Sequence, residues 1–353
     1  MTILYFLLLL TVIICIHEAG HLLAAKLFGV YCYEYSFGMG PVLLKKKTKE
    51  TQYSLRAIPV GGFVSMAGEP DGDEAYPDVV VPEGRRLTDK PTWQRIIIML
   101  AGVMMNFLLC WVILSMIILS NGAFAESSKA MVEHVVENSP AEKAGFKDGD
   151  IIREITVDGR STKPQTFQEL QIFLADNQGE PVTFALERNQ ELVSVTVTPE
   201  YSKEFGGYWI GIQAPDYNVV KVNFLNCWYY GAKEMGLIAK LMFDAIRQLL
   251  TGKNLNQLSG PVGIYSATEE SVSYGLTSYL FLIAELSLNV GLFNLLPLPI
   301  LDGGQVVMTL GEAIAGKKLN PKVKLAIMGA CWILLIGLML FVTWNDISKI
   351  VIH

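Results

Sequence analysis

The sequence predicts a membrane α-helical bundle of four transmembrane helices, with a small soluble α+β domain inserted between the second and the third. Three observations predict this fold. Hydrophobic residues make up 51% of the 353 residues, and the mean hydropathy of +0.37 lies above the values typical of soluble globular proteins. The apolar residues are concentrated in long runs. One stretch between two of these runs is instead acidic, and alternates polar and apolar residues as strands do.

Four apolar runs reach the roughly 20 residues that a helix needs to cross a bilayer. They cover residues 2–23, 96–119, 277–296 and 325–343. The first run lacks the basic residues and the small-residue cleavage site of a signal peptide, so we expect it to remain as a helix. Four spans place both termini on the same side of the membrane.

Basic residues near the helix ends predict the orientation, because cytoplasmic loops are enriched in lysine and arginine. Such residues follow the first run and precede the second and the fourth: Lys45, Lys46, Lys47, Lys49, Arg85, Arg86, Lys90, Arg95, Lys317, Lys318, Lys322 and Lys324. Residues 254–316 contain no lysine or arginine. We therefore expect the basic loops to be cytoplasmic, and both termini and the long loop 121–276 to be extracytoplasmic.

The first apolar run contains the sequence His-Glu-Ala-Gly-His at residues 17–21. On a helix the i, i+4 spacing places His17 and His21 on one face, where both imidazoles can bind one zinc ion. Glu18 is turned about 100° away from that face, so we expect it to act as the general base toward a metal-activated water. Ordinary surface residues are the alternative, but ionisable side chains inside a span cost a few kcal/mol each unless paired or metal-bound.

A catalytic zinc site needs a third protein ligand, and the two remaining histidines, His134 and His353, lie outside the apolar runs. A carboxylate is therefore required. Asp302 is the best candidate, because two prolines precede it and two glycines follow it, and such residues break a helix. The break lets the carboxylate turn into the protein at membrane depth. The alternative is an ordinary loop aspartate at the cytoplasmic end of the third span.

The acidic stretch 125–200 is expected to be a separate domain. Its pattern predicts strands at 131–136, 151–157, 182–188 and 191–198, a helix at 167–177, and turns at Asp158-Gly159 and Asn189-Gln190. The run SPAEKAGFKDGDIIREITVDG resembles PDZ domains of the bacterial protease type. This resemblance implies peptide capture by strand addition in a groove, and a steric cap without a ligand is the alternative.

Residues 222–250 have apolar positions at spacings of three and four, which predicts an amphipathic helix. Such a helix either lies on the outer membrane surface or packs against the membrane core, and both alternatives remain open. The net charge of −6 gives no indication of nucleic-acid binding, so the expected partners are the lipid bilayer and other proteins. The predicted domains are a membrane core in two parts, at 1–124 and 277–353, a PDZ domain at 125–200, and a linker at 201–276 that contains the amphipathic helix.

The sequence HEAGH in the first run, SLNVGLFNLLPLPILDGG in the third and the PDZ-like insertion together resemble the site-2 protease family, in its bacterial regulator-of-sigma-E protease form. The resemblance covers nearly the whole chain. It implies an intramembrane zinc endopeptidase of the bacterial inner membrane, with its active site near the cytoplasmic side. Its substrates would be transmembrane segments of single-pass proteins, such as anti-sigma factors or signal-peptide remnants, already cut by another protease.

The resemblance also implies substrate-binding residues. Asn289 and Asn294 would hold the unwound substrate, and residues 35–66 would form a membrane-associated β-hairpin whose exposed edge, at Gly61 and Gly62, pairs with it. A plain cytoplasmic hairpin is the alternative. Two positions depart from the family pattern. Val103 replaces a proline before Asn106-Phe107, which puts a helix bend there in doubt, and Gln305 replaces a frequent histidine.

Two other classes of function are compatible with parts of the sequence. One is a membrane-anchored PDZ adaptor with an inert metal site, and the intact HExxH motif with Glu18 argues against it. The other is a metal-dependent transporter, and the absence of an inverted repeat argues against that.

Overall fold

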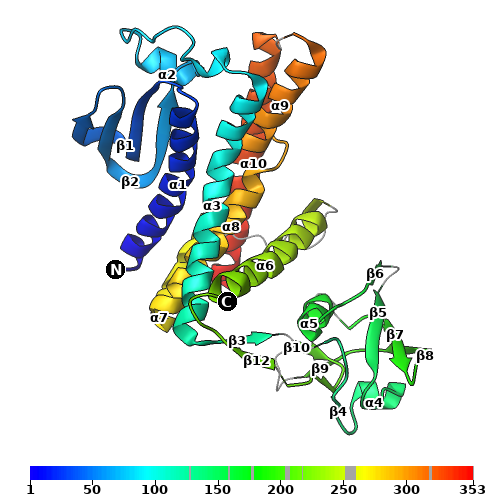
Figure 1. The fold of residues 1–353 in the computed structure, drawn as a ribbon. Coiled ribbons are helices and arrows are strands. Elements are labelled where there is room, and N and C mark those ends of the chain that lie inside the picture. The colour runs from blue at the N-terminus through cyan, green and yellow to red at the C-terminus, as the bar shows by residue number, and fades with distance from the viewer. Residues whose placement is uncertain are drawn as a thin grey trace. The chain divides into compact units, whose positions relative to one another are not determined.

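The computed structural model describes residues 1–126, 129–157, 160–175, 179–202, 207–216, 218–250, 260–317 and 320–352. The chain divides into two compact units (Figure 1). The first consists of Met1–Ser120 with Phe224–His353, and the second of Asn121–Asn223. The predicted turn at Asp158-Gly159 lies outside the described residues.

Four helices of the first unit are long and apolar enough to cross a membrane, counting the described residues. They are α1 (Thr2–Leu27), α3 (Thr92–Asn121), α8 (Leu276–Asn294) and α10 (Pro321–Ile352). The four predicted spans are therefore confirmed as helices, whereas their orientation stays a prediction. Helix α3 continues through Val103 without interruption, so the segment that lacks the family's proline is helical throughout.

Close packing of α1 on α3 depends on small residues, as is common where membrane helices meet. A Cβ atom added to Gly20 of α1 would lie 2.3 Å from the carbonyl oxygen of Ala101 in α3. On another face α1 packs against α8 through a buried cluster that includes Leu9 and Tyr279, and the Tyr279 hydroxyl donates to the Tyr5 carbonyl at 2.8 Å. Helix α1, which carries the HExxH motif, is thus held between two neighbours.

A β-hairpin follows α1 and lies beside it (Figure 1). Its strands are β1 (Cys32–Lys47) and β2 (Gln52–Met66), and both bend. As a result Tyr35 lies opposite Tyr53 at one end of β2 and opposite Val64 at the other. The bend in β1 uses Gly38 and Gly40, whose φ angles of +79° and +81° favour glycine. The last part of β2 is left as an edge along α1, where Thr11 donates to the Pro59 carbonyl at 2.8 Å.

The buried carboxylate of Glu34 fastens the hairpin internally. It accepts hydrogen bonds from Ser54, from Arg56 and from Tyr76, which follows the short helix α2 (Pro70–Ala75). Burial raises the pKa of Glu34, but these hydrogen bonds outweigh it and hold the pKa below its ordinary value. The hairpin and the α2 segment are therefore joined by a fully paired charge.

The remaining helices of this unit are the 3₁₀ helix η1 (Leu87–Asp89), α6 (Cys227–Leu250), α7 (Pro261–Tyr274) and α9 (Asp302–Ala315). Helix α6, the predicted amphipathic helix, packs against α3 and α8 through a cluster that includes Ile238 and Leu288. The Trp111 indole also donates to the Trp228 carbonyl at 2.8 Å. Of the two open placements, the structure therefore has the helix packed against the membrane core.

The second unit is built on a four-stranded antiparallel sheet of order β6-β5-β7-β8. Its elements are β3 (Ala123–Glu126), β4 (His134–Val135), α4 (Pro140–Ala144), β5 (Ile151–Val157), β6 (Arg160–Thr162), α5 (Phe167–Ala175), β7 (Val182–Arg188), β8 (Glu191–Val197), β9 (Glu200–Ser202), β10 (Gly207–Trp209), β11 (Ile212–Gln213) and β12 (Asn218–Lys221). Asn189 and Gln190 form the predicted turn with φ angles of +50° and +69°. The predicted strand 131–136 is shorter, with only His134–Val135 as a strand.

The second unit extends beyond the predicted boundaries of 125 and 200. Strand β11 pairs with β4, and β12 pairs with β3, so the chain returns to the start of the unit before it leaves. Residues predicted as the first part of a linker therefore complete this unit. This pairing joins segments that are far apart in the sequence, so no local sequence pattern predicts it.

Candidate zinc centre and active site

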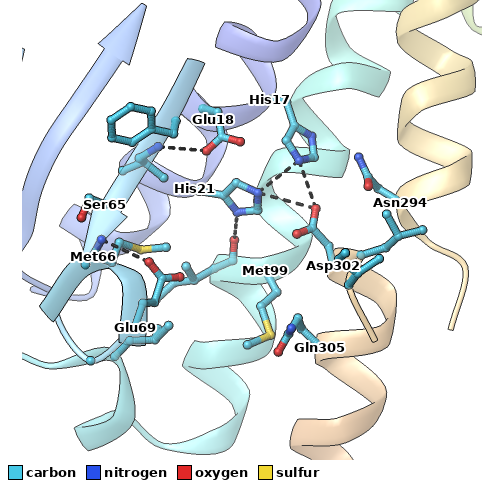
Figure 2. A pocket seen from close by; sticks show the side chains of 18 of the residues that line it. His17, Glu18, His21, Ser65, Met66, Glu69, Met99, Asn294, Asp302 and Gln305 are labelled. Atoms are coloured by element: carbon cyan, nitrogen blue, oxygen red, sulfur yellow. Dashed lines mark hydrogen bonds and ion pairs between the residues drawn. The ribbon is translucent and has the colours of Figure 1, made fainter. Parts of the chain in front are cut away.

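Three side chains from two distant segments meet inside the first unit. The Nε2 atoms of His17 and His21, on α1, lie 3.1 and 3.5 Å from Oδ2 of Asp302, and 3.3 Å from each other (Figure 2). Both histidines are buried, with 7% of each residue exposed. The structure thus brings together the three residues that the sequence suggested as metal ligands.

The spacing of these atoms fits a tetrahedral zinc ion. Ligand atoms at the usual 2.0–2.1 Å from zinc are about 3.3 Å apart when the geometry is tetrahedral. The Asp302 Oδ2 atom is also buried without a hydrogen-bond donor, so its lone pairs and those of the imidazoles converge on one point. Among the described residues this is the group of histidine, cysteine and acidic side chains close enough to share a metal ion.

Helix α3 makes room for the imidazoles with a glycine. A Cβ atom added to Gly102 would lie 2.4 Å from His21 Nε2 and 2.8 Å from His17 Cε1, which is closer than real contacts allow. The backbone of α3 also orients one ligand, since the Ile98 carbonyl accepts a hydrogen bond from His21 Nδ1 at 2.8 Å. That bond leaves Nε2 of His21 free for a metal.

Asp302 reaches the histidines because α8 ends at Asn294 and a non-helical segment precedes α9. The sequence predicts that Gly303 and Gly304 break the helix, and this prediction is wrong, because both lie in the first turn of α9. Their role is close packing, because a Cβ on Gly304 would lie 2.0 Å from the Leu298 carbonyl oxygen. Gln305 steadies the same segment by donating to the Pro299 carbonyl at 2.8 Å.

Glu18 lies beside the three-residue cluster and contacts the hairpin edge. Its Oε2 accepts a hydrogen bond from the backbone N–H of Val64 at 3.1 Å (Figure 2). The edge of β2 therefore runs next to the carboxylate that the sequence suggested as general base.

A cavity of about 1090 Å³ contains the cluster and Glu18. It is lined by residues of α1, of β2, of the first turns of α3, of the α8–α9 segment and of α10, among them Phe63, Val64, Met99, Asn294 and Leu325. Most of the lining is apolar. Its titratable groups come from several elements, and His17, Glu18 and His21 of α1 lie among them with Asp302 of α9. Such a cavity can hold an apolar peptide segment against a few fixed polar groups.

The other predicted substrate-binding residues are placed differently. Asn294 lines the cavity, whereas Asn289, Gly61 and Gly62 do not. Residues 63–66, directly after the predicted glycines, form the part of the edge that faces the cavity. Sequence reasoning missed Val64 and the cradle at Gly102, because neither carries a side chain with recognisable chemistry.

Comparison with known proteins gives the family. The sequence profile of peptidase family M50 matches residues 5–338. The chain belongs to peptidase family M50. The regulator of sigma-W protease RasP of Bacillus subtilis is 30% identical over 99% of this chain and 99% of its own length. The zinc metalloprotease RasP of Shouchella clausii is likewise 30% identical, with the same coverage of both chains.

Among solved structures, the crystal structure of the PDZ domain of the SdrC-like protein Lin2157 from Listeria innocua is similar to part of this M50 peptidase. It is 26% identical, covers 26% of this chain and 98% of that one, and has a TM-score of 0.22. Membership of M50, with relatives named zinc metalloproteases, identifies a site-2-type metalloprotease with zinc as its cofactor. The apolar helices make it a multi-pass membrane protein.

Proposed function

We propose that this M50 peptidase cleaves transmembrane segments of single-pass membrane proteins that another protease has already shortened. One observation supports the proposal above all. The cluster of His17, His21 and Asp302 lies with Glu18 in one cavity, among helices apolar enough to cross a membrane. A substrate reaches such a site through the bilayer, which favours membrane-embedded peptide segments over soluble proteins.

The proposed roles follow from the geometry. His17, His21 and Asp302 hold zinc, which supplies Lewis-acid activation of a water molecule and of the scissile carbonyl. Glu18 takes the proton of the attacking water and passes it to the leaving amine. Its hydrogen bond from the Val64 N–H holds the carboxylate at the cavity wall, beside the ligands rather than among them.

The edge of β2 supplies a surface for the substrate backbone. Proteases cut extended chains, and a transmembrane helix hides its amides, so an unwound segment needs new hydrogen-bond partners. Residues 63–66 form an edge along the cavity, where the N–H groups of Val64 and Met66 donate to the carboxylates of Glu18 and Glu69. Asn294 lies on the α8 side of the same cavity. We infer that the substrate lies between them, with Asn294 bonding its backbone. Asn289 does not line the cavity, so we propose that it contacts the substrate only before the substrate enters the cavity.

Two other functions would not need Glu18. A metal transporter would require the metal cluster alone, and a membrane-anchored adaptor with an inert metal site would require neither the cluster nor Glu18. The carboxylate lies against the substrate edge and next to the ligands, which is the arrangement that hydrolysis requires. This observation favours a protease over both.

Replacing Asp302 with alanine tests the metal site. Two imidazoles alone hold zinc poorly, so the purified variant is expected to retain less than about a tenth of the wild-type zinc affinity and to lose proteolysis. Zinc content by atomic absorption, and cleavage of a trimmed single-pass substrate in detergent, provide the two readouts. Asp346, which caps α7 by accepting from Gly260 N at 2.8 Å, offers a matched control, because Asp346→Asn should keep zinc. Full zinc occupancy in Asp302→Ala would exclude Asp302 as a ligand.

We further propose that the second unit is a PDZ domain on the outer side of the membrane that admits only trimmed substrates. Glu126 of β3 lies opposite Asn218 of β12, so residues 127–217 can be replaced with an Asn-Gly turn. This deletion is expected to leave zinc binding intact, because the ligands lie in the first unit. The shortened enzyme should cleave substrates that keep their outer domains, which the full chain rejects.

The deletion separates two roles of the domain. If the domain recruits substrate, cleavage of the trimmed substrate falls instead. Unchanged cleavage of long and trimmed substrates by a folded, zinc-loaded deletion protein would contradict both roles. Adding Glu18→Gln to the deletion should reduce cleavage by about 10²- to 10⁴-fold, which controls for contaminating proteases.

A further inference from the structure

Asn106 of α3 is fully buried next to the zinc-ligand cluster, and one end of its side-chain amide has no hydrogen-bond partner. Its amide Nδ2 lies 3.3 Å from Nδ1 of His17, while its Oδ1 is buried with no hydrogen-bond partner. Asn106 follows Gly102 by one helical turn, so both face α1. A buried amide oxygen without a donor costs about 1–3 kcal/mol, and therefore needs an explanation.

The zinc site constrains what Asn106 can do. His17 turns its Nε2 toward Asp302 and His21, so Nε2 must be unprotonated to bind zinc and Nδ1 must then carry the proton. An N–H of His17 facing the NH₂ group of Asn106 sets one donor against another. Rotating the amide by 180° exchanges its oxygen and nitrogen, which occupy nearly the same positions. The oxygen then accepts from His17 Nδ1–H and gains the partner it lacks, while the NH₂ group takes the position that has no partner among the described residues.

We propose that Asn106 is a positioning residue that accepts the Nδ1–H of His17 and so holds the imidazole in the tautomer that presents Nε2 to zinc. This inference rests on the proposed zinc site. His21 is held in a parallel way, because its Nδ1 bonds to the carbonyl of Ile98 at 2.8 Å. Helix α3 thus orients both histidine ligands, one through its backbone and one through the Asn106 side chain.

Asn106 is itself held in place by α8. The Ser287 hydroxyl donates to the backbone carbonyl of Asn106 at 3.0 Å. A Cβ atom added to Gly291 of α8 would lie 3.5 Å from the Asn106 Cβ. The amide therefore has a fixed backbone behind it, as a residue that orients a metal ligand requires. A polar residue that merely joins two membrane helices would need no alignment with a ring nitrogen of a ligand.

Zinc affinity tests the proposal without relying on activity. All proteins carry Glu18→Gln, so that self-cleavage cannot interfere, and zinc is titrated against a chelator in detergent. Asn106→Leu, which cannot accept a hydrogen bond, is expected to weaken zinc binding about 10- to 100-fold. Asn106→Asp, which keeps the acceptor oxygen, should restore affinity to within a few-fold of the parent. Ser115→Ala, which removes another buried polar group of α3, should leave affinity unchanged.

A second measurement needs no variant at Asn106. The chain has four histidines, so ¹⁵N-histidine spectra of the zinc-loaded protein can be assigned by comparison with His17→Gln. We expect His17 to carry its proton on Nδ1, and the opposite tautomer would overturn the proposal even if Asn106→Leu does not fold. Equal zinc affinity in Asn106→Leu and the parent would overturn it as well. If zinc binding to the parent does not depend on Asp302, the proposed zinc site fails instead, which is a separate outcome.

Discussion

Replacing Glu18 with glutamine is expected to reduce proteolysis by about 10²- to 10⁴-fold, while zinc stays bound. Glutamine has nearly the same shape as glutamate but cannot take a proton from the attacking water. Because Glu18 lies beside the ligands and bonds to the Val64 N–H, its loss as a base removes no metal ligand. The amide oxygen of glutamine can still accept the Val64 hydrogen bond, so the hairpin edge should stay in place.

Cleavage of a trimmed single-pass substrate and zinc content are measured on the same preparation of Glu18→Gln. Glu69, another carboxylate that lines the cavity, gives a matched control, since Glu69→Gln should retain most of the activity. Near wild-type cleavage by Glu18→Gln would refute its role as general base. Loss of zinc from that variant would instead make Glu18 a ligand, and the mechanism would need a different base.

Replacing Gly102 of α3 with alanine, which adds one methyl group, is expected to displace the imidazoles of the zinc centre that pack against this helix. The new Cβ would lie 2.4 Å from His21 Nε2, which is the atom proposed to bind zinc. Overpacking of this kind costs about 1–3 kcal/mol, equivalent to a loss in zinc affinity of about 5- to 150-fold. Because the imidazoles move, activity should fall by at least as much as zinc affinity.

Zinc titration and substrate cleavage of Gly102→Ala provide the measurement, and thermal unfolding in detergent reports whether the protein is folded. Gly329→Ala is the control, because this helical glycine of α10 has no atom within 4 Å of an added Cβ. It should match the wild type in zinc affinity and in activity. Full zinc binding by Gly102→Ala would mean that the two imidazoles do not lie against Gly102 in the zinc-bound protein.

Much of the site could be predicted because its chemistry is local in the sequence. The spacing of His17 and His21 puts them on one helix face whatever surrounds the helix, and the cost of burying them in an apolar run singles them out. Asp302 was found by elimination, since the chain offers few other ligands near the later spans. The pattern of prolines and glycines marked an interruption there, although the glycines serve to pack α9 rather than to break it.

The sequence by itself determined the four apolar helices, the residues of the candidate metal site and the presence of an inserted second unit, because hydropathy and helical spacing act within a single element. Only the tertiary structure decided which groups surround that chemistry. The contact of Val64 with Glu18, the alignment of Asn106 with His17 and the space left by Gly102 each join separate elements. The pairing of β12 with β3 also set the limits of the second unit. These features depend on how elements pack, and a backbone amide, a glycine or a lone amide has no local signature that reveals its partner.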